Sequence, residues 1–232
     1  MENLVLYRGD SDDRLINNAE SIRKLRQRLT ERQLCTNLIS GGNGQDAFTK
    51  DMLYRVKMHI FPEEEKKFTH FLSFSEKENI AFHFGAKTHE STIGKISLED
   101  CINLDYIEEE YDTNDFDFAL IKLEIKNFKD IIEKEKGVYE YLYDSNNIKF
   151  PKSNILLIDT VTYLDNNRNN TEDHLIIAKK EKEWLILPQN MELLNNNKYE
   201  YSAILPMGKV FNFKKYRVKD TNLTNMTLKD FL

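Results

Sequence analysis

The C-terminal half of the chain contains a series of short apolar segments whose pattern is typical of an antiparallel sheet. In residues 118–126, FALIKLEIK, apolar side chains at 121, 123 and 125 alternate with charged ones at 122, 124 and 126, as on the two faces of a strand. Further strands are expected at 154–163, 174–178, 181–188 and 199–206, and earlier ones at 3–8 and 69–73. A chain with this many short strands must pair them into a sheet that organises the whole fold.

Helical periodicity is concentrated in the N-terminal half. Residues 14–34 and 47–61 place apolar side chains at helical spacing. A shorter helix is expected after a capping box, with Ser75 as N-cap and Glu78 three residues later, and with Gly85 just past its end. Outside these segments, a helix is expected at 129–137 and a mobile surface loop at 165–173. Helices followed by strands predict an α+β fold built on a mostly antiparallel sheet.

Composition restricts the class of protein. A chain of 232 residues without a recognisable linker suits a single domain, 1–232. Its net charge of -6 argues against a broad nucleic-acid surface, although a local basic patch remains compatible with it. The two cysteines are far apart and outside any metal-ligand spacing, so we expect reduced thiols and no metal. No signal peptide or membrane span is recognisable, and we expect a cytoplasmic protein with no membrane partner.

Two carboxylates stand two residues apart at Glu181 and Glu183, directly before an apolar segment that ends at Pro188. On a strand, both would lie on the same face, about 7 Å apart. Carboxylates this close discourage each other's ionisation, which is useful when the two have different catalytic tasks. Such pairs are common in a chain this rich in acidic residues, and a solvated strand end is the alternative interpretation.

The pair follows two other short motifs, LYRG at 6–9 and FLSFSEKENIAFHFG at 71–85. Taken in order with EKEWLILP at 181–188, they resemble the R-S-E class of ADP-ribosyltransferases, which includes cholera-toxin-like enzymes. Members of this class carry an arginine on the first strand, a serine-rich segment before a helix, and a Glu-x-Glu motif. The resemblance implies an ADP-ribosyltransferase-like split β-sandwich, with helices in the N-terminal half and NAD as substrate.

The resemblance also implies catalytic roles. Glu183 would stabilise the positive charge that develops on the ribose as nicotinamide leaves, and would accept a hydrogen bond from the 2′-hydroxyl. Glu181 would orient or deprotonate the acceptor. Arg8 would pair with an NAD phosphate, for which a guanidinium is well shaped. Ser73 would hold the catalytic glutamate by a hydroxyl hydrogen bond.

The cofactor-binding residues expected by resemblance are Arg8, Gly9, Ser73, Ser75 and Phe84. Gly9 would let the backbone approach the nicotinamide carboxamide, with an ordinary turn glycine as the alternative. Ser75 has a purely structural alternative as a helix cap, and Phe84 has one as a core residue. Arg8, taken alone, is equally compatible with a surface arginine at a strand end.

The acceptor is less constrained than the NAD site. A glutamate at the first position of the third motif goes with protein arginine acceptors in the resembling family. Nucleic-acid bases are the alternative, because residues 23–32 and 213–219 are basic; NAD hydrolysis and an inactive NAD-binding module are further alternatives. By analogy, we expect a toxin-like effector from a toxin–antitoxin, phage-defence or phage-encoded system, for which an antitoxin or immunity protein is a possible partner.

Overall fold

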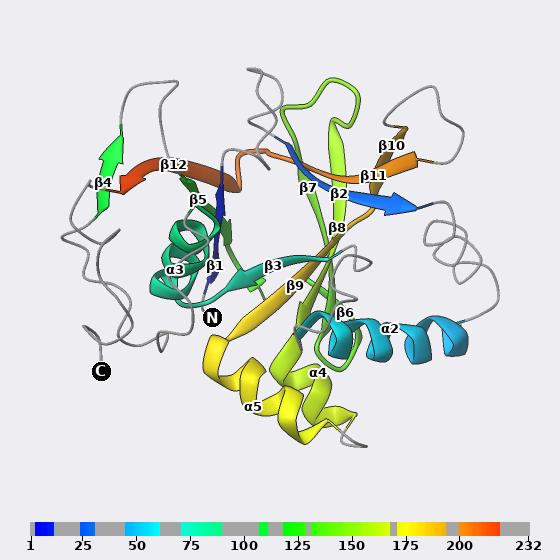
Figure 1. Ribbon diagram of the computed structural model, residues 1–232. Coiled ribbons are helices and arrows are strands. Elements are labelled where there is room, and N and C mark those ends of the chain that lie inside the picture. The colour runs from blue at the N-terminus through cyan, green and yellow to red at the C-terminus, as the bar shows by residue number, and fades with distance from the viewer. Residues whose placement is uncertain are drawn as a thin grey trace, which may run out of the picture.

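The computed structural model describes residues 3–11, 24–30, 45–60, 71–89, 107–110, 118–128, 131–167, 171–193 and 200–218 (Figure 1). The helices in these ranges are α2 (Gln45–Ile60), α3 (Glu78–His89), α4 (Thr160–Asn166) and α5 (Glu172–Glu181). None of these helices is long and apolar enough to cross a membrane.

The strands form one large sheet and one small one. They are β1 (Leu4–Ser11), β2 (Lys24–Thr30), β3 (Leu72–Ser75), β4 (Ile107–Glu110), β5 (Phe118–Ile125), β6 (Ile132–Glu135), β7 (Val138–Asp144), β8 (Lys152–Asp159), β9 (Glu183–Pro188), β10 (Asn190–Leu193), β11 (Glu200–Pro206) and β12 (Phe211–Val218). The large, curled sheet has the order β4-β12-β5-β1-β3-β9-β8-β7-β6, and the small sheet has the order β10-β11-β2 (Figure 1). Every strand pair is antiparallel. The described chain therefore has the α+β organisation on an antiparallel sheet that the sequence predicts.

The large sheet is weakly joined at its centre. β1 pairs with β5 along its whole length, from Leu4 to Ser11. With β3, its paired register within the described residues is limited to Tyr7 opposite Ser75. The part of the sheet that ends at β1 and the part that begins at β3 therefore separate beside this pair. There, the described backbone of the two strands is not joined by a regular ladder of hydrogen bonds.

One face of the sheet holds the largest core cluster. Leu6 of β1, Phe74 of β3 and Trp184 of β9 are buried together there, and Leu205 of β11 packs against them. The Tyr143 hydroxyl of β7 donates to the Pro206 carbonyl at 2.6 Å, and burial raises the pKa of this phenol above its ordinary value. The small sheet is thus attached to this face by packing and by a buried hydrogen bond.

Helices cover the opposite face. Val56 of α2, Tyr163 of α4 and Ala178 of α5 pack with Leu185 and Leu187 of β9. Because side chains alternate along a strand, β9 directs these leucines to the helices and its tryptophan to the other core. α3 covers the same side of the sheet over β1 and β5 (Figure 1).

Residues 24–30 form strand β2, whereas the sequence predicts a helix there. β2 pairs with β11 from Lys24 opposite Pro206 to Thr30 opposite Glu200. The apolar residues Leu25 and Leu29 are four positions apart, and this spacing places them on one face of a helix and also on one face of a strand. The remainder of the predicted helix, residues 14–23 and 31–34, lies outside the described residues.

The helix predicted at 129–137 is also wrong, because this segment contains β6 and a hairpin turn. Gly137 in the turn has a φ of 82°, which glycine adopts without a steric penalty. A Cβ atom at Gly137 would also lie 2.7 Å from the backbone nitrogen of Tyr163. The glycine thus allows the tight turn and the close approach of α4. Residues 129 and 130 lie outside the described residues.

Two helices stand in the C-terminal half, where the sequence predicts strands and a loop. The 174–178 segment lies within α5, because a short apolar run does not distinguish a strand from a helix. Acidic residues in its first turn and lysines in its last turn favour the helix through its dipole. α4 begins where β8 ends, with the Asp159 carboxylate accepting from the backbone nitrogens of Val161 and Thr162. The predicted loop 165–173 is partly helical, and residues 168–170 lie outside the described residues.

Candidate functional site

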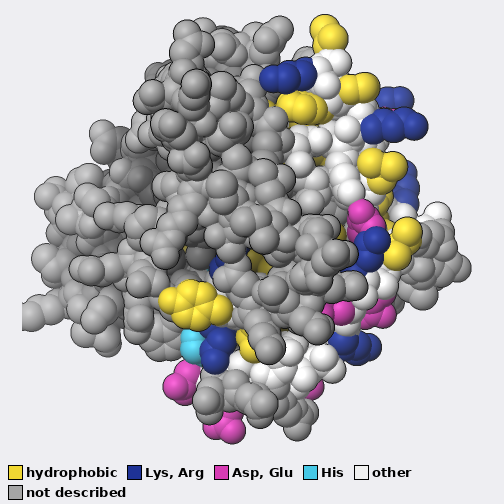
Figure 2. Space-filling model, turned by 90° about the vertical axis from the view of Figure 1, so that its right-hand side faces the viewer, with side chains coloured by type: hydrophobic (Ala, Val, Ile, Leu, Met, Phe, Trp, Pro, Cys, Tyr) yellow, Lys and Arg dark blue, Asp and Glu magenta, His cyan; other side chains and the backbone are white. Residues whose placement is uncertain are grey.

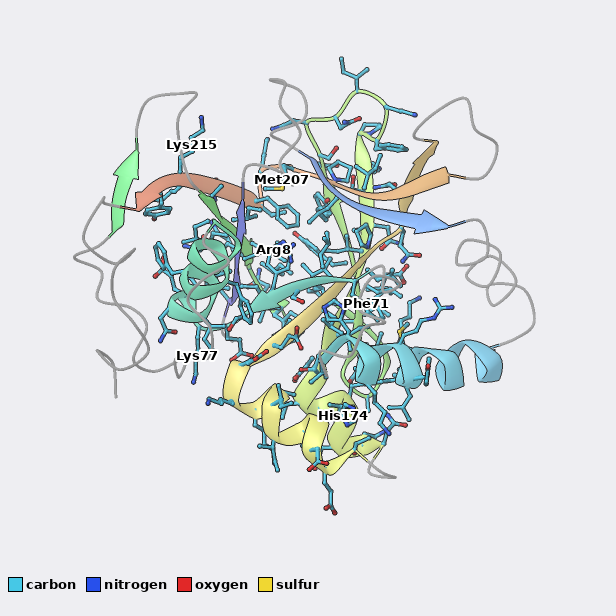
Figure 3. All side chains as sticks on the ribbon, viewed as in Figure 1. Arg8, Phe71, Lys77, His174, Met207 and Lys215 are labelled. Atoms are coloured by element: carbon cyan, nitrogen blue, oxygen red, sulfur yellow. The ribbon has the colours of Figure 1, made fainter. Side chains whose placement is uncertain are left out.

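Three segments far apart in the sequence meet where the large sheet separates. β1, β3 and β9 are neighbours, and one line of register joins Tyr7 to Ser75 and Ser75 to Glu183. Arg8 therefore lies next to the strands that carry the serines and the glutamate (Figure 3). The structure brings together residues from all three sequence motifs.

The Arg8 side chain bridges the separation between β1 and β3. Its Nη1 donates to the backbone carbonyl oxygen of Ser73 at 2.9 Å. The side chain is half-buried, so its planar group is fixed against β3 but is not enclosed. A guanidinium held this way is a suitable fixed partner for an anionic group of a ligand.

Glu183 is the first residue of β9 and is buried, with 7% of its surface exposed. Its carbonyl oxygen accepts from the Thr160 hydroxyl at 2.6 Å. Its Oε1 lies 3.9 Å from Nε2 of His59 on α2. A carboxylate is costly to bury unless polar groups surround it, so its location here indicates a constraint other than packing.

His59 is a site residue that our interpretation of the motifs missed. Its Nε2 lies 2.5 Å from the Ser73 hydroxyl oxygen, and its ring packs edge-on against Phe71. A signal for this position is present in the sequence. Met52, Val56 and Ile60 form the buried stripe of α2, and His59 lies on the same stripe. A histidine on the apolar face of a helix indicates a polar partner on the neighbouring element.

Glu181 does not lie on β9 beside Glu183, so the prediction of two carboxylates on one strand face is wrong. It is the last residue of α5, and Lys182 between the two glutamates has the left-handed backbone conformation, with φ 49° and ψ 46°. This residue ends the helix, and β9 begins at the next residue, Glu183. The two carboxylates therefore belong to different elements and have different surroundings.

Ser75 joins the end of β3 to the end of α5. Its hydroxyl donates to the Glu181 carbonyl oxygen at 2.6 Å and accepts from the Lys77 backbone nitrogen at 3.0 Å. Because α3 begins at Glu78, Ser75 is not its N-cap, and the predicted capping box does not form. The serine instead satisfies a carbonyl group that the end of α5 leaves without a helical partner.

Gly9 packs directly against α3. A Cβ atom at this position would lie 2.0 Å from the Ala81 carbonyl oxygen and 2.6 Å from the Gly85 nitrogen. This glycine is therefore required by the contact between β1 and α3. Gly85 lies inside α3 and not past its end, while Phe84 is 38% exposed and thus not a core residue.

Lys182→Gly is expected to stabilise the protein by about 1 kcal/mol, because the left-handed conformation is unfavourable for any residue with a Cβ. The lysine side chain is exposed, so its removal leaves the packing unchanged. The measurement is the free energy of unfolding in urea. Lys182→Ala is the matched control and should show no such gain. Destabilisation by the glycine would mean that the lysine side chain itself holds the turn.

A separate cavity of about 720 Å³ lies between α2, α4 and α5. Leu53 and Val161 contribute apolar surface to its lining, and Lys136, Asp165 and Lys179 contribute charged groups. None of the residues from the three sequence motifs lines it. Within the described ranges, no group of three or more His, Cys, Asp or Glu residues is placed to hold a metal ion.

Comparisons of the chain with known protein families, with curated proteins and with solved structures found no match.

Proposed function

We propose that this protein is an NAD-dependent mono-ADP-ribosyltransferase with the split-sheet fold of that class. The observation that supports this proposal best is the convergence of Arg8, Ser73 and Glu183 on three adjacent strands where the sheet separates. Arg8 is tied to Ser73 through the backbone carbonyl of the serine. His59 lies between the Ser73 hydroxyl and the Glu183 carboxylate. Arg8, Ser73 and Glu183 are the residues by which the sequence resembles the family.

The proposed reaction transfers ADP-ribose from nicotinamide to an acceptor. The bond between the ribose C1′ and the nicotinamide nitrogen breaks, and its electron pair leaves with the neutral nicotinamide. The positive charge that develops on the ribose is stabilised by the Glu183 carboxylate, which is anchored on a sheet and largely withdrawn from water. The acceptor then bonds to C1′ and gives up a proton, which the Glu181 carboxylate would accept.

The other residues of the site orient these groups. Arg8 would hold an NAD phosphate, since its guanidinium is fixed against β3 by the Ser73 carbonyl. His59 contacts the Ser73 hydroxyl and lies near the Glu183 carboxylate, so it would set the distance between them. Ser75 would act as a positioning residue through the backbone at Glu181, to whose carbonyl oxygen its hydroxyl donates.

The acceptor that we propose is a protein arginine, with the protein acting as a toxin-like effector. A broad nucleic-acid surface would be uniformly basic. In the described part of the face shown in Figure 2, the charged side chains in the upper part are all basic and acidic side chains accompany basic ones in the lower part, while the whole chain has a net charge of -6. This distribution supports a protein acceptor over a nucleic acid.

The test of the function is incubation of the purified protein with NAD labelled on its adenylate, with and without a cell lysate. Release of nicotinamide together with transfer of label to a protease-sensitive, nuclease-resistant product is expected. Label that is lost only on nuclease treatment would identify a nucleic-acid acceptor. Nicotinamide release without label transfer would indicate NAD hydrolysis, and the lack of both would exclude the proposed activity.

Glu181→Gln is expected to lower transfer on the order of 100-fold while leaving NAD hydrolysis within about threefold of wild type. Glu181 ends a helix and Glu183 begins a strand, so the first can serve the acceptor without touching the ribose. The measurement compares labelled acceptor with released nicotinamide in the same reaction. Equal losses of the two activities would assign Glu181 to cleavage of NAD.

A further inference from the structure

Each backbone carbonyl oxygen from Lys180 to Glu183 accepts a hydrogen bond from a residue outside this segment. Within this segment, the carbonyl oxygens of Lys180, Glu181 and Lys182 accept from the Lys77 side chain, the Ser75 hydroxyl and the Glu76 backbone nitrogen, respectively. Thr160 supplies the bond to the carbonyl oxygen of Glu183. The last carbonyl groups of a helix have no helical partners. This accounts for the bonds to Lys180 and Glu181, which are the last residues of α5. It does not account for the bond to Glu183, which belongs to β9.

Thr160 is the first residue of α4 and directly follows the last paired residue of β8. The ladder between β8 and β9 ends with Asp159 opposite Trp184, and Thr160 is the next residue along the chain. There the chain turns into α4, so a regular backbone bond to the next residue of β9 is replaced by the Thr160 hydroxyl bond to Glu183. Thr160 has no exposed surface, and the bond is therefore shielded from competition by water.

The residue on the other side of Glu183 is fixed as well. Nε1 of Trp184 donates to Oε1 of Glu76 at 2.8 Å, and the indole ring packs edge-on against Phe128. The backbone of the glutamate thus has one anchor at its own carbonyl and another at the following side chain. A catalytic carboxylate loses much of its effect when it is displaced by about 1 Å, so such anchors matter for rate.

We propose that Thr160 is a positioning residue that fixes the orientation of the Glu183 carboxylate through its backbone carbonyl. This inference rests on the proposed function, because it concerns the same glutamate. In this role, Thr160 touches neither the substrate nor the reacting atoms. It acts on the rate of nicotinamide release and not on the binding of NAD.

The test compares Thr160→Val, which replaces the hydroxyl with a methyl group of similar size, with Thr160→Ser, which keeps the hydroxyl. Thr160→Val is expected to lower kcat for nicotinamide release about tenfold, with KM for NAD within twofold of wild type. Thr160→Ser is expected to keep kcat at the wild-type level. Thr171→Val is the matched control. Thr171 is also buried, and its hydroxyl bonds the carbonyl oxygens of Leu164 and Asn167 at the end of α4, not the carbonyl of Glu183.

A second readout does not depend on activity. Trp184 is the only tryptophan in the chain, and it follows Glu183 directly. Quenching of its fluorescence by acrylamide should increase in Thr160→Val and stay at the wild-type level in Thr160→Ser and Thr171→Val. If the wild-type protein releases no nicotinamide, the proposed function fails, while quenching still reports whether Thr160 holds this segment.

Three outcomes would overturn the inference. They are an unchanged kcat in folded Thr160→Val, an equal loss of kcat in Thr171→Val, and unchanged quenching in Thr160→Val. If Thr160→Val does not fold, Thr160→Ala takes its place with the same expected loss, because it removes the hydroxyl without adding a methyl group against the Glu183 carbonyl.

Discussion

Glu183→Gln is expected to lower nicotinamide release on the order of 1,000-fold while NAD still binds within a few fold of wild type. The substitution keeps the size of the side chain and removes its charge. That charge is the group that we expect to stabilise the ribose cation, and it is scarcely accessible to water in the free protein. Its effect should therefore appear in kcat far more than in KM.

The stability of this variant distinguishes a catalytic role from a structural one. Burying a carboxylate is unfavourable, so the neutral glutamine should leave the free energy of unfolding unchanged or raise it. Glu140→Gln is the control. Hydrogen bonds from Lys134 and Asn154 lower the pKa of Glu140, but it lies on β7, away from the site, and activity should be retained. Wild-type rates in Glu183→Gln would remove the catalytic assignment.

The sequence predicts correctly those elements whose apolar pattern fits only one type of secondary structure. β5 alternates apolar and charged residues from Ile121 to Ile125, and a helix cannot place these two isoleucines and Leu123 on one side with Lys122 and Glu124 on the other. The central strands β1, β3 and β9 were also expected within a few residues of their bounds. The errors fall on ambiguous segments. Leu25 and Leu29 fit a strand as well as a helix, and the apolar run of α5 is too short to decide.

In the site too, the features that follow from a local sequence pattern are predicted, and those that depend on contacts between distant segments are not. The motif order predicts that Arg8, Ser73 and Glu183 converge, and the strands that carry them are neighbours. The left-handed conformation of Lys182 was not predictable, because nothing in its side chain favours it, and so Glu181 was assigned to the strand. His59 lies on the buried stripe of α2, which signals a polar partner, but no motif identifies that partner. Its role depends on the packing of α2 against β3, which a single sequence does not specify.

Gly9→Ala is expected to destabilise the protein by about 3 kcal/mol, near the upper end of the usual cost of overpacking. The new methyl group would lie 2.0 Å from the Ala81 carbonyl oxygen, and its other close neighbours are backbone atoms of Gly85. Backbone atoms of a helix cannot rotate away as a flexible side chain can, so α3 or β1 must shift. The measurement is unfolding in urea, and Gly9→Ser should cost more than Gly9→Ala because its side chain is larger.

This prediction also decides between two explanations of the glycine in the first motif. If Gly9 serves the approach of nicotinamide, the alanine variant should keep its stability and lose affinity for NAD. If it serves the contact of β1 with α3, stability should fall first, and activity should fall only as far as Arg8 is displaced with its strand. The distances to Ala81 and Gly85 favour the second explanation. The arginine and the glycine would then be needed together. The glycine allows β1 to pack closely on α3, and this packing places the Arg8 guanidinium against β3.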